Sequence, residues 1–220
     1  MGVKAAPVPP ANLVIAVDGP AASGKGTIAR ALAEHFGLPH LDTGLLYRAV
    51  ALNLLRRELD PDSEFAAVRA CDGIAGLLAD EELRSETVGG IASRISAYPA
   101  VREALLERQR DFAGLNGGAV LDGRDIGTVI APDAYAKLFV TASSQVRAER
   151  RLAELQARGV TAHYPDVLLD IEARDERDSH RSAAPLRQAG DAMLLDTSAL
   201  DRDQSIAAAI RLVEERLAAV

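Results

Sequence analysis

Short apolar runs alternate with longer helical patterns along most of the chain. Residues 37–41 contain a helix stop, Gly37 with Pro39, followed by a short strand. Four other runs, rich in branched apolar residues, have the length expected of strands buried on both faces: residues 13–17, 119–121, 137–140 and 193–195. Because strands that alternate with helices build parallel sheets, the pattern predicts an α/β fold with a doubly wound, five-stranded parallel sheet.

The helical patterns divide the chain further. They cover residues 28–36, 45–59, 83–97, 101–115, 145–158 and 205–220. Residues 60–117 show helices only, and residues 159–190 are polar and rich in arginine. We therefore expect one domain with three parts: a core (12–59, 118–158 and 191–220), a helical insertion (60–117) and a lid (159–190). Residues 1–11, with three prolines and no periodic pattern, are expected to form a disordered tail.

Composition and charge exclude several classes of function. The net charge of -7 and the pI near 5.2 argue against binding to long nucleic acid, which requires a basic surface. No long apolar span indicates export or membrane insertion, so we expect a cytoplasmic protein, and a monomer. Cys71 cannot form an internal disulfide and lies among apolar residues, which favours a packing role. The four histidines have neither zinc-ligand spacing nor a catalytic-triad arrangement.

A loop of small residues joins the first strand to the first helix. Residues 18–27 are Asp-Gly-Pro-Ala-Ala-Ser-Gly-Lys-Gly-Thr. Three of these residues lack a Cβ: Gly19, Gly24 and Gly26. The backbone can therefore curl with its amides pointing inward at a helix N-terminus, which favours the binding of anions. Lys25 would place its charge on the β- and γ-phosphates, and the Thr27 hydroxyl can reach a magnesium ion. The loop therefore predicts a polyphosphate site with Mg²⁺, and the strand and helix around it disfavour a chance turn.

Polar residues end or follow the first three strands. Asp18 ends the first, Asp42 and Thr43 follow the second, and Asp122-Gly-Arg124-Asp125 follows the third. Because the carboxyl ends of parallel strands converge on one rim, these carboxylates can hold magnesium and its waters or anchor arginines. Thr43 can hydrogen-bond a second ligand. Asp42 can equally serve as a helix cap, whereas Asp122 is the stronger metal candidate, because a buried acid needs a partner.

Six arginines are candidates for phosphate binding: Arg48, Arg102, Arg124, Arg174, Arg177 and Arg181. The last three recur at i, i+3 and i+7, so they lie along one face of a helix. A solvated face of salt bridges is the alternative interpretation. The flanking residues 159–165 and 182–190 have the composition of hinges, which favours a mobile lid that closes over a triphosphate and excludes water.

The motifs as a set resemble one family. The loop departs from the common pattern Gly-x-x-x-x-Gly-Lys-Ser/Thr because Gly26 precedes Thr27, an ending that resembles nucleoside monophosphate kinases. Further motifs are similar to those of bacterial cytidylate kinases over nearly the full chain: Leu41-Asp-Thr-Gly-Leu-Leu-Tyr-Arg48, Ala92-Ser93, Tyr98-Pro-Ala-Val-Arg-Glu-Ala104 through Gln109-Arg110, Leu121-Asp-Gly-Arg-Asp-Ile-Gly-Thr128, and Arg174-Asp-Glu-Arg-Asp178 to Pro185-Leu186.

The resemblance implies a P-loop kinase fold in which residues 60–117 bind a nucleoside monophosphate. It also implies transfer of the γ-phosphoryl group of ATP to CMP or dCMP, with Mg²⁺ as cofactor. The implied ATP-binding residues are Gly19, Pro20, Ala21, Ala22, Ser23, Gly24, Lys25, Gly26 and Thr27. The implied monophosphate-binding residues are Thr43, Arg48, Ser93, Arg102, Arg124, Asp125, Asp178 and Arg181. Catalysis is assigned to Lys25, Arg124, Arg174 and Arg177, and the metal to Thr27, Asp42 and Asp122.

The resemblance also assigns tasks within the monophosphate site. Ser93, Arg124 and Asp125 match positions expected to recognise the cytosine edge, while Arg48 and Arg102 match those expected to bind the acceptor phosphate. The chain departs from the family at two points. Thr43 occupies a position where serine is common, and residues 60–92 are too short and too helical for the strand-bearing insert of many relatives.

Two other functions are compatible with a phosphate loop. One is a P-loop kinase for a small metabolite such as shikimate, against which the set Thr43, Ser93 and Arg124-Asp125 argues. The other is a nucleotide-dependent switch or binding module. Guanine recognition in GTPases usually needs an Asn-Lys-x-Asp element, and this element does not occur in the sequence.

Overall fold

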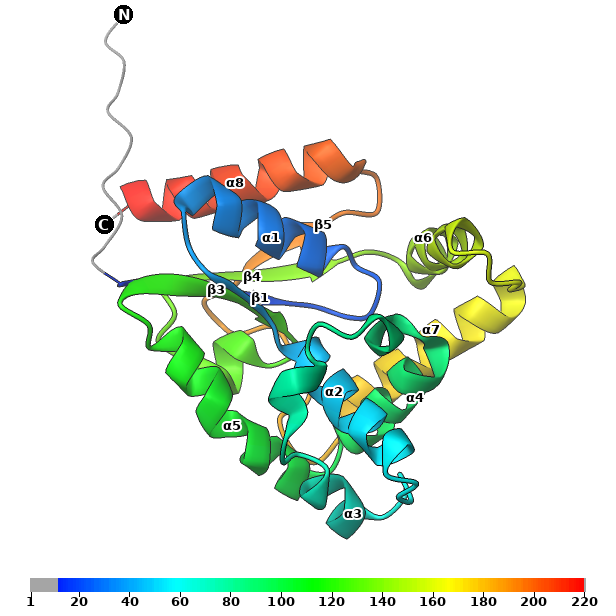
Figure 1. The fold of residues 1–220 in the computed structure, drawn as a ribbon. Coiled ribbons are helices and arrows are strands. Elements are labelled where there is room, and N and C mark those ends of the chain that lie inside the picture. Colours follow the sequence, from blue (N-terminus) through cyan, green and yellow to red (C-terminus); the bar gives the residue numbers. More distant parts are fainter. Residues whose placement is uncertain (1–11, 220) are drawn as a thin grey trace, which may run out of the picture.

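A five-stranded parallel sheet forms the centre of the protein. The computed structural model describes residues 12–219, so the tail expected at residues 1–11 lies outside the described residues. The strands are β1 (Asn12–Asp18), β2 (His40–Asp42), β3 (Gly117–Gly123), β4 (Ala136–Thr141) and β5 (Met193–Asp196). Their order is β2-β3-β1-β4-β5, and every neighbouring pair is parallel (Figure 1). The predicted doubly wound α/β sheet is therefore confirmed, with all five strands where the apolar runs place them.

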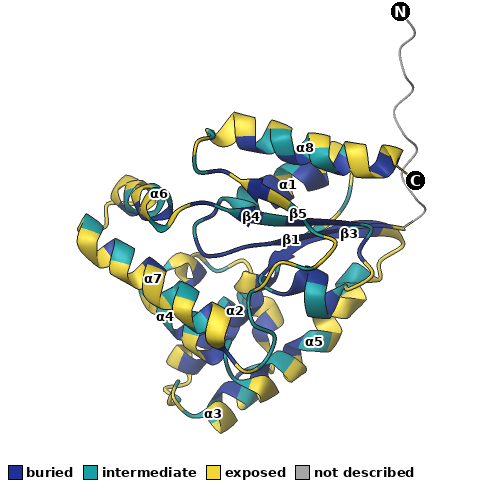
Figure 2. Cartoon of the chain, turned by 180° about the vertical axis from the view of Figure 1, so that it is seen from behind, coloured by how far each residue is buried: buried dark blue, intermediate teal, exposed yellow. Residues whose placement is uncertain are grey.

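Helices cover both faces of this sheet. On one face lie α1 (Lys25–Phe36) and α8 (Arg202–Ala218), which bury apolar side chains against β1 and β4 (Figures 1 and 2). On the other face, α5 (Pro99–Ala113) packs over β1 and β3 together with a short π-helical turn, η3 (Ile126–Ile130). Because β1 and β3 are covered on both sides, their apolar runs show no alternation with polar residues.

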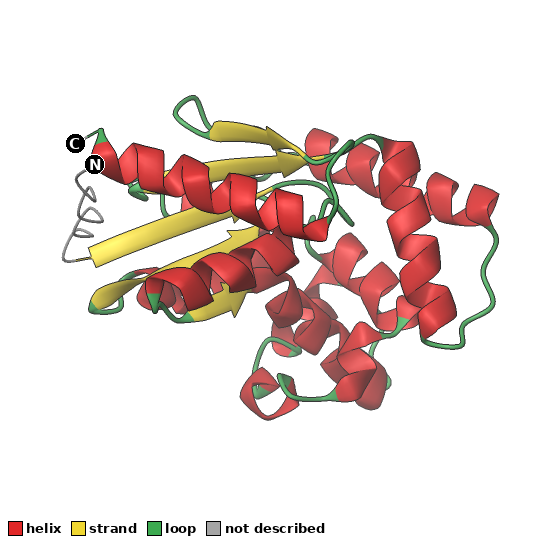
Figure 3. Cartoon of the chain, turned by 90° about the horizontal axis from the view of Figure 1, so that it is seen from above, coloured by secondary structure: helices red, strands yellow, loops and turns green. Residues whose placement is uncertain are grey.

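A second core of helices lies beyond the carboxyl ends of the strands (Figure 3). Its elements are α2 (Thr43–Arg56), α3 (Glu64–Arg69), η1 (Ile74–Leu77), η2 (Glu81–Arg84) and α4 (Glu86–Ile95), packed with the start of α5. Residues 60–116, all of which the structure describes, contain no strand. The prediction of a single helix at 83–97 is wrong, because the structure has two separate helices there, η2 and α4. Ser85 adopts an extended backbone and caps α4 by accepting a hydrogen bond from the Val88 amide at 3.3 Å, which separates α4 from η2.

The segment expected to form the lid contains a long helix. Helix α7 (Tyr164–His180) packs against α6 (Ser144–Ala157) through apolar side chains that include Leu155 and Ile171. Pro165 lies in the first turn of α7, where a proline is tolerated because that amide has no partner in the helix. The hinge-like stretch 159–165 thus ends earlier than expected. The mobility of residues 159–190 and the three-part division of the domain remain predictions. None of the helices in residues 12–219 is long and apolar enough to cross a membrane.

Candidate active site

The loop between β1 and α1 is shaped by close approach and by backbone conformation. A Cβ on Gly19 would lie 2.0 Å from the Val140 carbonyl oxygen, so only glycine fits there. Gly24 has a left-handed backbone (φ +87°) at the N-cap of α1, and its carbonyl accepts hydrogen bonds from Thr27 and Ile28 at 3.1 Å each. Because a glycine cap supplies no side-chain acceptor, the first amides of α1 are available to an anion.

Lys25 is a partly buried cation at this helix start. Its Nζ donates to the Pro20 carbonyl at 3.3 Å. Burial, together with the positive charge of Arg124, lowers the pKa of Lys25 to about 8. A desolvated ammonium of this kind attracts phosphate strongly, because little water competes for it.

Two acids lie next to the loop, in a cavity of about 320 Å³ that is also lined by Lys25 and Thr27. Asp122 is buried, and its carboxylate pairs with His40 Nε2 at 2.7 Å, while its backbone carbonyl accepts from the Thr43 hydroxyl at 2.8 Å. Asp42 occupies the N-cap position of α2 without a regular side-chain cap, and its carboxylate interacts only weakly with the Gly44 amide of that helix. Burial and the neighbouring Asp122 raise the pKa of Asp42.

A hydroxyl and two carboxylates around one cavity are ligands that Mg²⁺ prefers, so these residues fit the ion. Within residues 12–219, no group of three or more His, Cys, Asp or Glu side chains could hold a metal by itself. A magnesium ion here would therefore also need oxygen ligands from a bound nucleotide.

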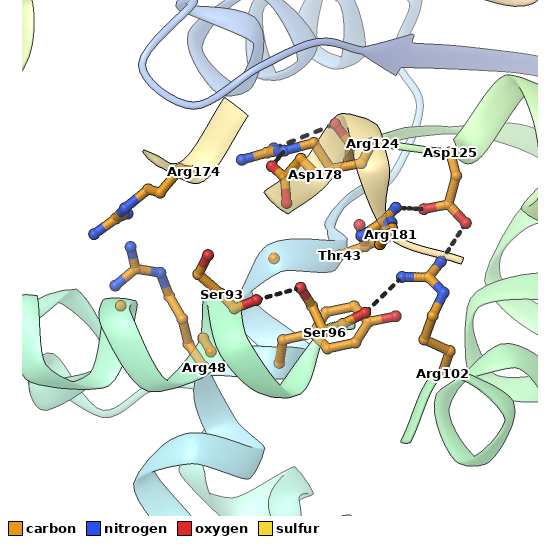
Figure 4. A pocket seen from close by; sticks show the side chains of 15 residues that line it. Thr43, Arg48, Ser93, Ser96, Arg102, Arg124, Asp125, Arg174, Asp178 and Arg181 are labelled. Atoms are coloured by element: carbon orange, nitrogen blue, oxygen red, sulfur yellow. Dashed lines mark hydrogen bonds and ion pairs between the residues drawn. The ribbon is translucent and has the colours of Figure 1, made fainter. Parts of the chain in front are cut away.

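A second cavity, of about 110 Å³, lies between α2, α4 and α7 and is lined by paired charges (Figure 4). Arg102 on α5 forms an ion pair with Asp125, whose other oxygen lies 3.4 Å from Arg181 Nη2. Arg124 Nε lies 2.6 Å from Asp178 Oδ2. Burial alone would raise the pKa of Asp178, but the charge of Arg124 and the hydrogen bond with it lower that pKa overall. The Asp178 carboxylate is therefore an ionised acceptor at neutral pH.

Arg48 and Arg174 face one another across this cavity (Figure 4). Arg48 Nη1 donates to the Leu83 carbonyl at 2.7 Å, and burial, assisted by the like charge of Arg174, lowers the pKa of Arg48. Arg174 Nε lies 2.8 Å from Asp170 Oδ2. Arg48, Arg124 and Arg174 line both cavities, so three cations lie where the two spaces meet.

The structure brings most of the predicted site residues to these two cavities. The residues predicted for the loop from Ala21 to Thr27, apart from Ser23, line the first, with Asp42 and Asp122. The second cavity is lined by all eight predicted monophosphate-binding residues: Thr43, Arg48, Ser93, Arg102, Arg124, Asp125, Asp178 and Arg181. Gly19, Pro20 and Ser23 line neither one. Arg177 also lines neither, although its Nε and Nη2 both donate to Ser93 Oγ at 3.4 Å.

Two buried charges perform tasks that the sequence did not reveal. Asp18, expected among the ligand-binding acids, instead accepts the amides of Ile126 and Gly127 at 2.8 Å each, and burial raises its pKa to about 6. It anchors the chain that follows Asp125. No spacing in the sequence could signal this contact, because it joins positions more than a hundred residues apart.

Arg147 on α6 is the second buried charge. Its Nε donates to the Ala142 carbonyl at 2.8 Å and its Nη1 to the Ala21 carbonyl at 3.2 Å. The guanidinium also pairs with both carboxylate oxygens of Asp175 on α7, at 3.0 and 2.5 Å. Arg147 therefore joins the phosphate loop to the helix that carries Arg174 and Asp178.

A third cavity, of about 480 Å³, opens on the other side of the loop. Ser23, Thr27 and Ile28 line it together with Leu200 and Arg150. The Arg150 guanidinium is held by hydrogen bonds to the carbonyl and hydroxyl of Thr197, at 2.7 and 3.0 Å. Residues 197–205 lack a motif of their own, so their place in this cavity could not be predicted.

Comparison with known proteins adds three findings. The family profile described as "Cytidylate kinase" matches residues 15–215. Proteins named cytidylate kinase from Xanthobacter autotrophicus and Rhodopseudomonas palustris are 60% and 57% identical to this chain; the alignments cover 94% and 92% of it, and 99% and 96% of those proteins. A crystal structure of an uncharacterized protein from Eubacterium ventriosum has a TM-score of 0.55 at 14% identity, over 92% of this chain and 99% of that one. This last likeness concerns the fold alone.

Proposed function

The chain belongs to the cytidylate kinase family, and on that premise we propose that it transfers the γ-phosphoryl group of ATP to CMP or dCMP, releasing ADP and CDP or dCDP. It is thus a phosphotransferase. One observation carries the proposal in this chain: Arg48, Arg124 and Arg174 line both the cavity of the phosphate loop and the cavity of paired charges. A phosphoryl group that passes between two nucleotides would cross this cationic boundary, where its charge is compensated.

We propose that the donor site is the loop Gly19 to Thr27. The amides at the start of α1 and Lys25 would hold the triphosphate. Thr27, Asp42 and Asp122 would hold Mg²⁺, which supplies further compensation of phosphate charge. The third cavity, which Leu200 and Arg150 line beside the loop, is the space we assign to the adenosine part of ATP.

The acceptor site is proposed to be the cavity of paired charges. Cytosine offers a hydrogen-bond donor, its exocyclic amino group, where uracil offers a carbonyl oxygen. The Asp125 carboxylate, which lies beside Arg102 and Arg181, would accept from the amino group and repel the carbonyl, which favours CMP over UMP. Ser93 and Arg124 would bind the remaining acceptors of the base. Arg48 and Arg102 would bind the acceptor phosphate.

Two residues of the cavity would bind the same nucleotide from the lid side. Asp178, held by Arg124, lies in the last turn of α7, and Arg181, beside Asp125, directly follows that helix in an extended conformation. We assign them to the sugar and base of the monophosphate. Thr43, buried at the start of α2, would add a hydroxyl contact on the opposite wall.

The reaction requires positioning and charge compensation more than proton transfer. The acceptor phosphate is ionised at neutral pH, so no strong base is needed. Lys25, Arg124 and Arg174 would compensate the charge of the moving phosphoryl group. Closure of residues 159–190 would exclude water and bring Arg177, which lines neither cavity here, to the same group. We therefore propose direct in-line transfer, without a covalent enzyme intermediate.

The test is the rate of ADP formation with CMP, dCMP, UMP, AMP and shikimate as acceptors, at fixed ATP and Mg²⁺. We expect CMP and dCMP to exceed the others by at least tenfold in kcat/KM. Equal or faster turnover of UMP or AMP would overturn the cytidylate assignment, and turnover of shikimate alone would indicate a metabolite kinase.

We also propose that the protein is a cytoplasmic monomer. ATP and nucleoside monophosphates are intracellular metabolites, and residues of one chain line all three cavities. Light scattering during gel filtration would measure the mass directly, and a mass near twice 23.3 kDa would contradict the monomer.

A further inference from the structure

We propose that Gly89 is a positioning residue that sets the orientation of the Arg48 guanidinium and thereby the affinity of the second cavity for the acceptor nucleotide. The inference rests on the proposed function, in which Arg48 binds the phosphate of CMP. It concerns a helix position that makes no polar contact of its own.

The observation is the space beside Gly89 in α4. A Cβ built on this residue would lie 3.0 Å from Arg48 Nη2, 3.1 Å from Nη1 and 3.3 Å from Cζ. All three contacts are tighter than side chains normally make. The guanidinium therefore packs flat against the helix backbone, in a space that only the absence of a side chain provides.

Nothing in the backbone explains this glycine. Gly89 is the fourth residue of α4 and has an ordinary helical conformation, so alanine would be the better helix former by about 1 kcal/mol. A glycine that costs helix stability and is not required by φ is best explained by what packs against it. Here that is the head of Arg48.

Arg48 has little freedom to move aside. Its Nη1 donates to the Leu83 carbonyl at 2.7 Å and lies 3.5 Å from the Ser85 carbonyl, at the turn before α4. Burial lowers the pKa of Arg48, and the nearby positive charges of Arg174 and Arg151 lower it further. A methyl group at position 89 would therefore push the guanidinium away from its carbonyl partners or toward like charges.

The displacement would reach the ligand because Gly89 and Arg48 both line the second cavity. Arginine binds phosphate through a planar fork whose two hydrogen bonds need a matching direction, so a small rotation weakens both. We expect Gly89→Ala to raise the Kd for CMP, and the KM for CMP, about tenfold. The KM for ATP should stay within twofold of the wild-type value.

The chain supplies a matched control one residue away. Gly90 lies in the same helix, and no heavy atom of residues 12–219 lies within 4 Å of a Cβ built on it beyond its own helix neighbourhood. Gly90→Ala should therefore raise the melting temperature by the gain in helix propensity and leave both KM values unchanged. The two variants add the same methyl group to the same helix, but only the one at position 89 meets the head of Arg48.

The experiment measures CMP binding by calorimetry and KM for both substrates, in wild type, Gly89→Ala and Gly90→Ala. A double-mutant cycle then repeats Gly89→Ala in an Arg48→Lys background. The ammonium of lysine is smaller than the guanidinium, so it does not contact the methyl group at position 89. The tenfold loss should disappear there. An equal loss in that background would overturn the inference, because the methyl group would then act by another route.

Other outcomes also decide the matter. Equal CMP affinity in wild type and Gly89→Ala would overturn the inference while leaving the proposed function intact. If the wild type bound no CMP at all, the proposed function itself would fail. Unfolding of Gly89→Ala but not Gly90→Ala would also contradict the inference, because the added methyl group meets only the end of one flexible side chain.

Discussion

Replacement of Asp175 by asparagine tests how the phosphate loop and α7 are held together. The Asp175 carboxylate forms two hydrogen bonds with Arg147, whose side chain is only 5% exposed and also donates to the Ala21 carbonyl in the loop. Asp175→Asn removes the charge and one acceptor while keeping the size. The Arg147 guanidinium then remains buried with its charge uncompensated.

The expected loss in the free energy of unfolding follows from how far the ion pair is buried. Removing one partner of a buried ion pair costs about 3–5 kcal/mol. The Asp175 side chain is 30% exposed, and asparagine retains one acceptor, so we place the loss at about 2 kcal/mol. For a chain of this length, about 1 kcal/mol corresponds to roughly 2–4 °C in melting temperature. Asp175→Asn should therefore melt about 4–8 °C below the wild type.

The same change should reduce turnover, because α7 carries Arg174 and Asp178. We expect kcat to fall by about tenfold or more, an effect of a displaced catalytic group. The assay is urea denaturation together with steady-state kinetics. Glu176→Gln is the matched control: the neighbouring side chain on the same helix is 73% exposed and should change stability by less than about 0.5 kcal/mol. Indistinguishable stability and kcat in the two variants would refute the reasoning.

Three further predictions follow from the site. Lys25→Ala should abolish turnover with an unchanged circular dichroism spectrum, and normal turnover would remove the loop from the mechanism. Between pH about 4 and 6 the folded protein keeps a proton on Asp18 that the unfolded chain releases, so the free energy of unfolding should fall by about 3 kcal/mol as pH rises through this window. Urea denaturation at several pH values should show this fall in the wild type and not in Asp18→Asn. An identical pH dependence in the two proteins would contradict the assignment. EDTA should stop turnover without changing the melting temperature of the nucleotide-free protein, and a lowered melting temperature would indicate a structural metal.

Much of the fold was predictable because its signals are local. The strand β1 and the glycine loop after it lie within about fifteen residues, and strand burial, turn geometry and helix start are all properties of adjacent residues. The position of the polar cluster at the end of β3 was also predictable, because the carboxyl ends of all strands in a parallel sheet lie at the same edge. Local signals therefore predicted the phosphate loop, the polar residues at the strand ends and the arginines, whereas Ser93 and Asp178 were assigned only through the resemblance to cytidylate kinases.

The remaining features depend on contacts between distant segments. The pairing of Arg147 with Asp175 joins two helices, and each residue separately has the appearance of an ordinary surface charge. The Asp18 carboxylate was expected near the ligand, but the amides of Ile126 and Gly127 take both its oxygens, within a π-helical turn that no periodicity signals. The start of α7 at Tyr164 was missed for another reason. Pro165 suggests a loop unless its place in a first helical turn is known.

Competition between two acceptors in one tube tests the central claim most directly. Equimolar CMP and UMP are incubated with limiting ATP and Mg²⁺, and the products are separated by liquid chromatography. The ratio of CDP to UDP early in the reaction equals the ratio of the two kcat/KM values. An acceptor site in which Asp125 meets the cytosine amino group predicts a ratio of at least ten to one in favour of CDP, with one ADP formed for each diphosphate. A ratio near one, or an excess of UDP, would contradict the account.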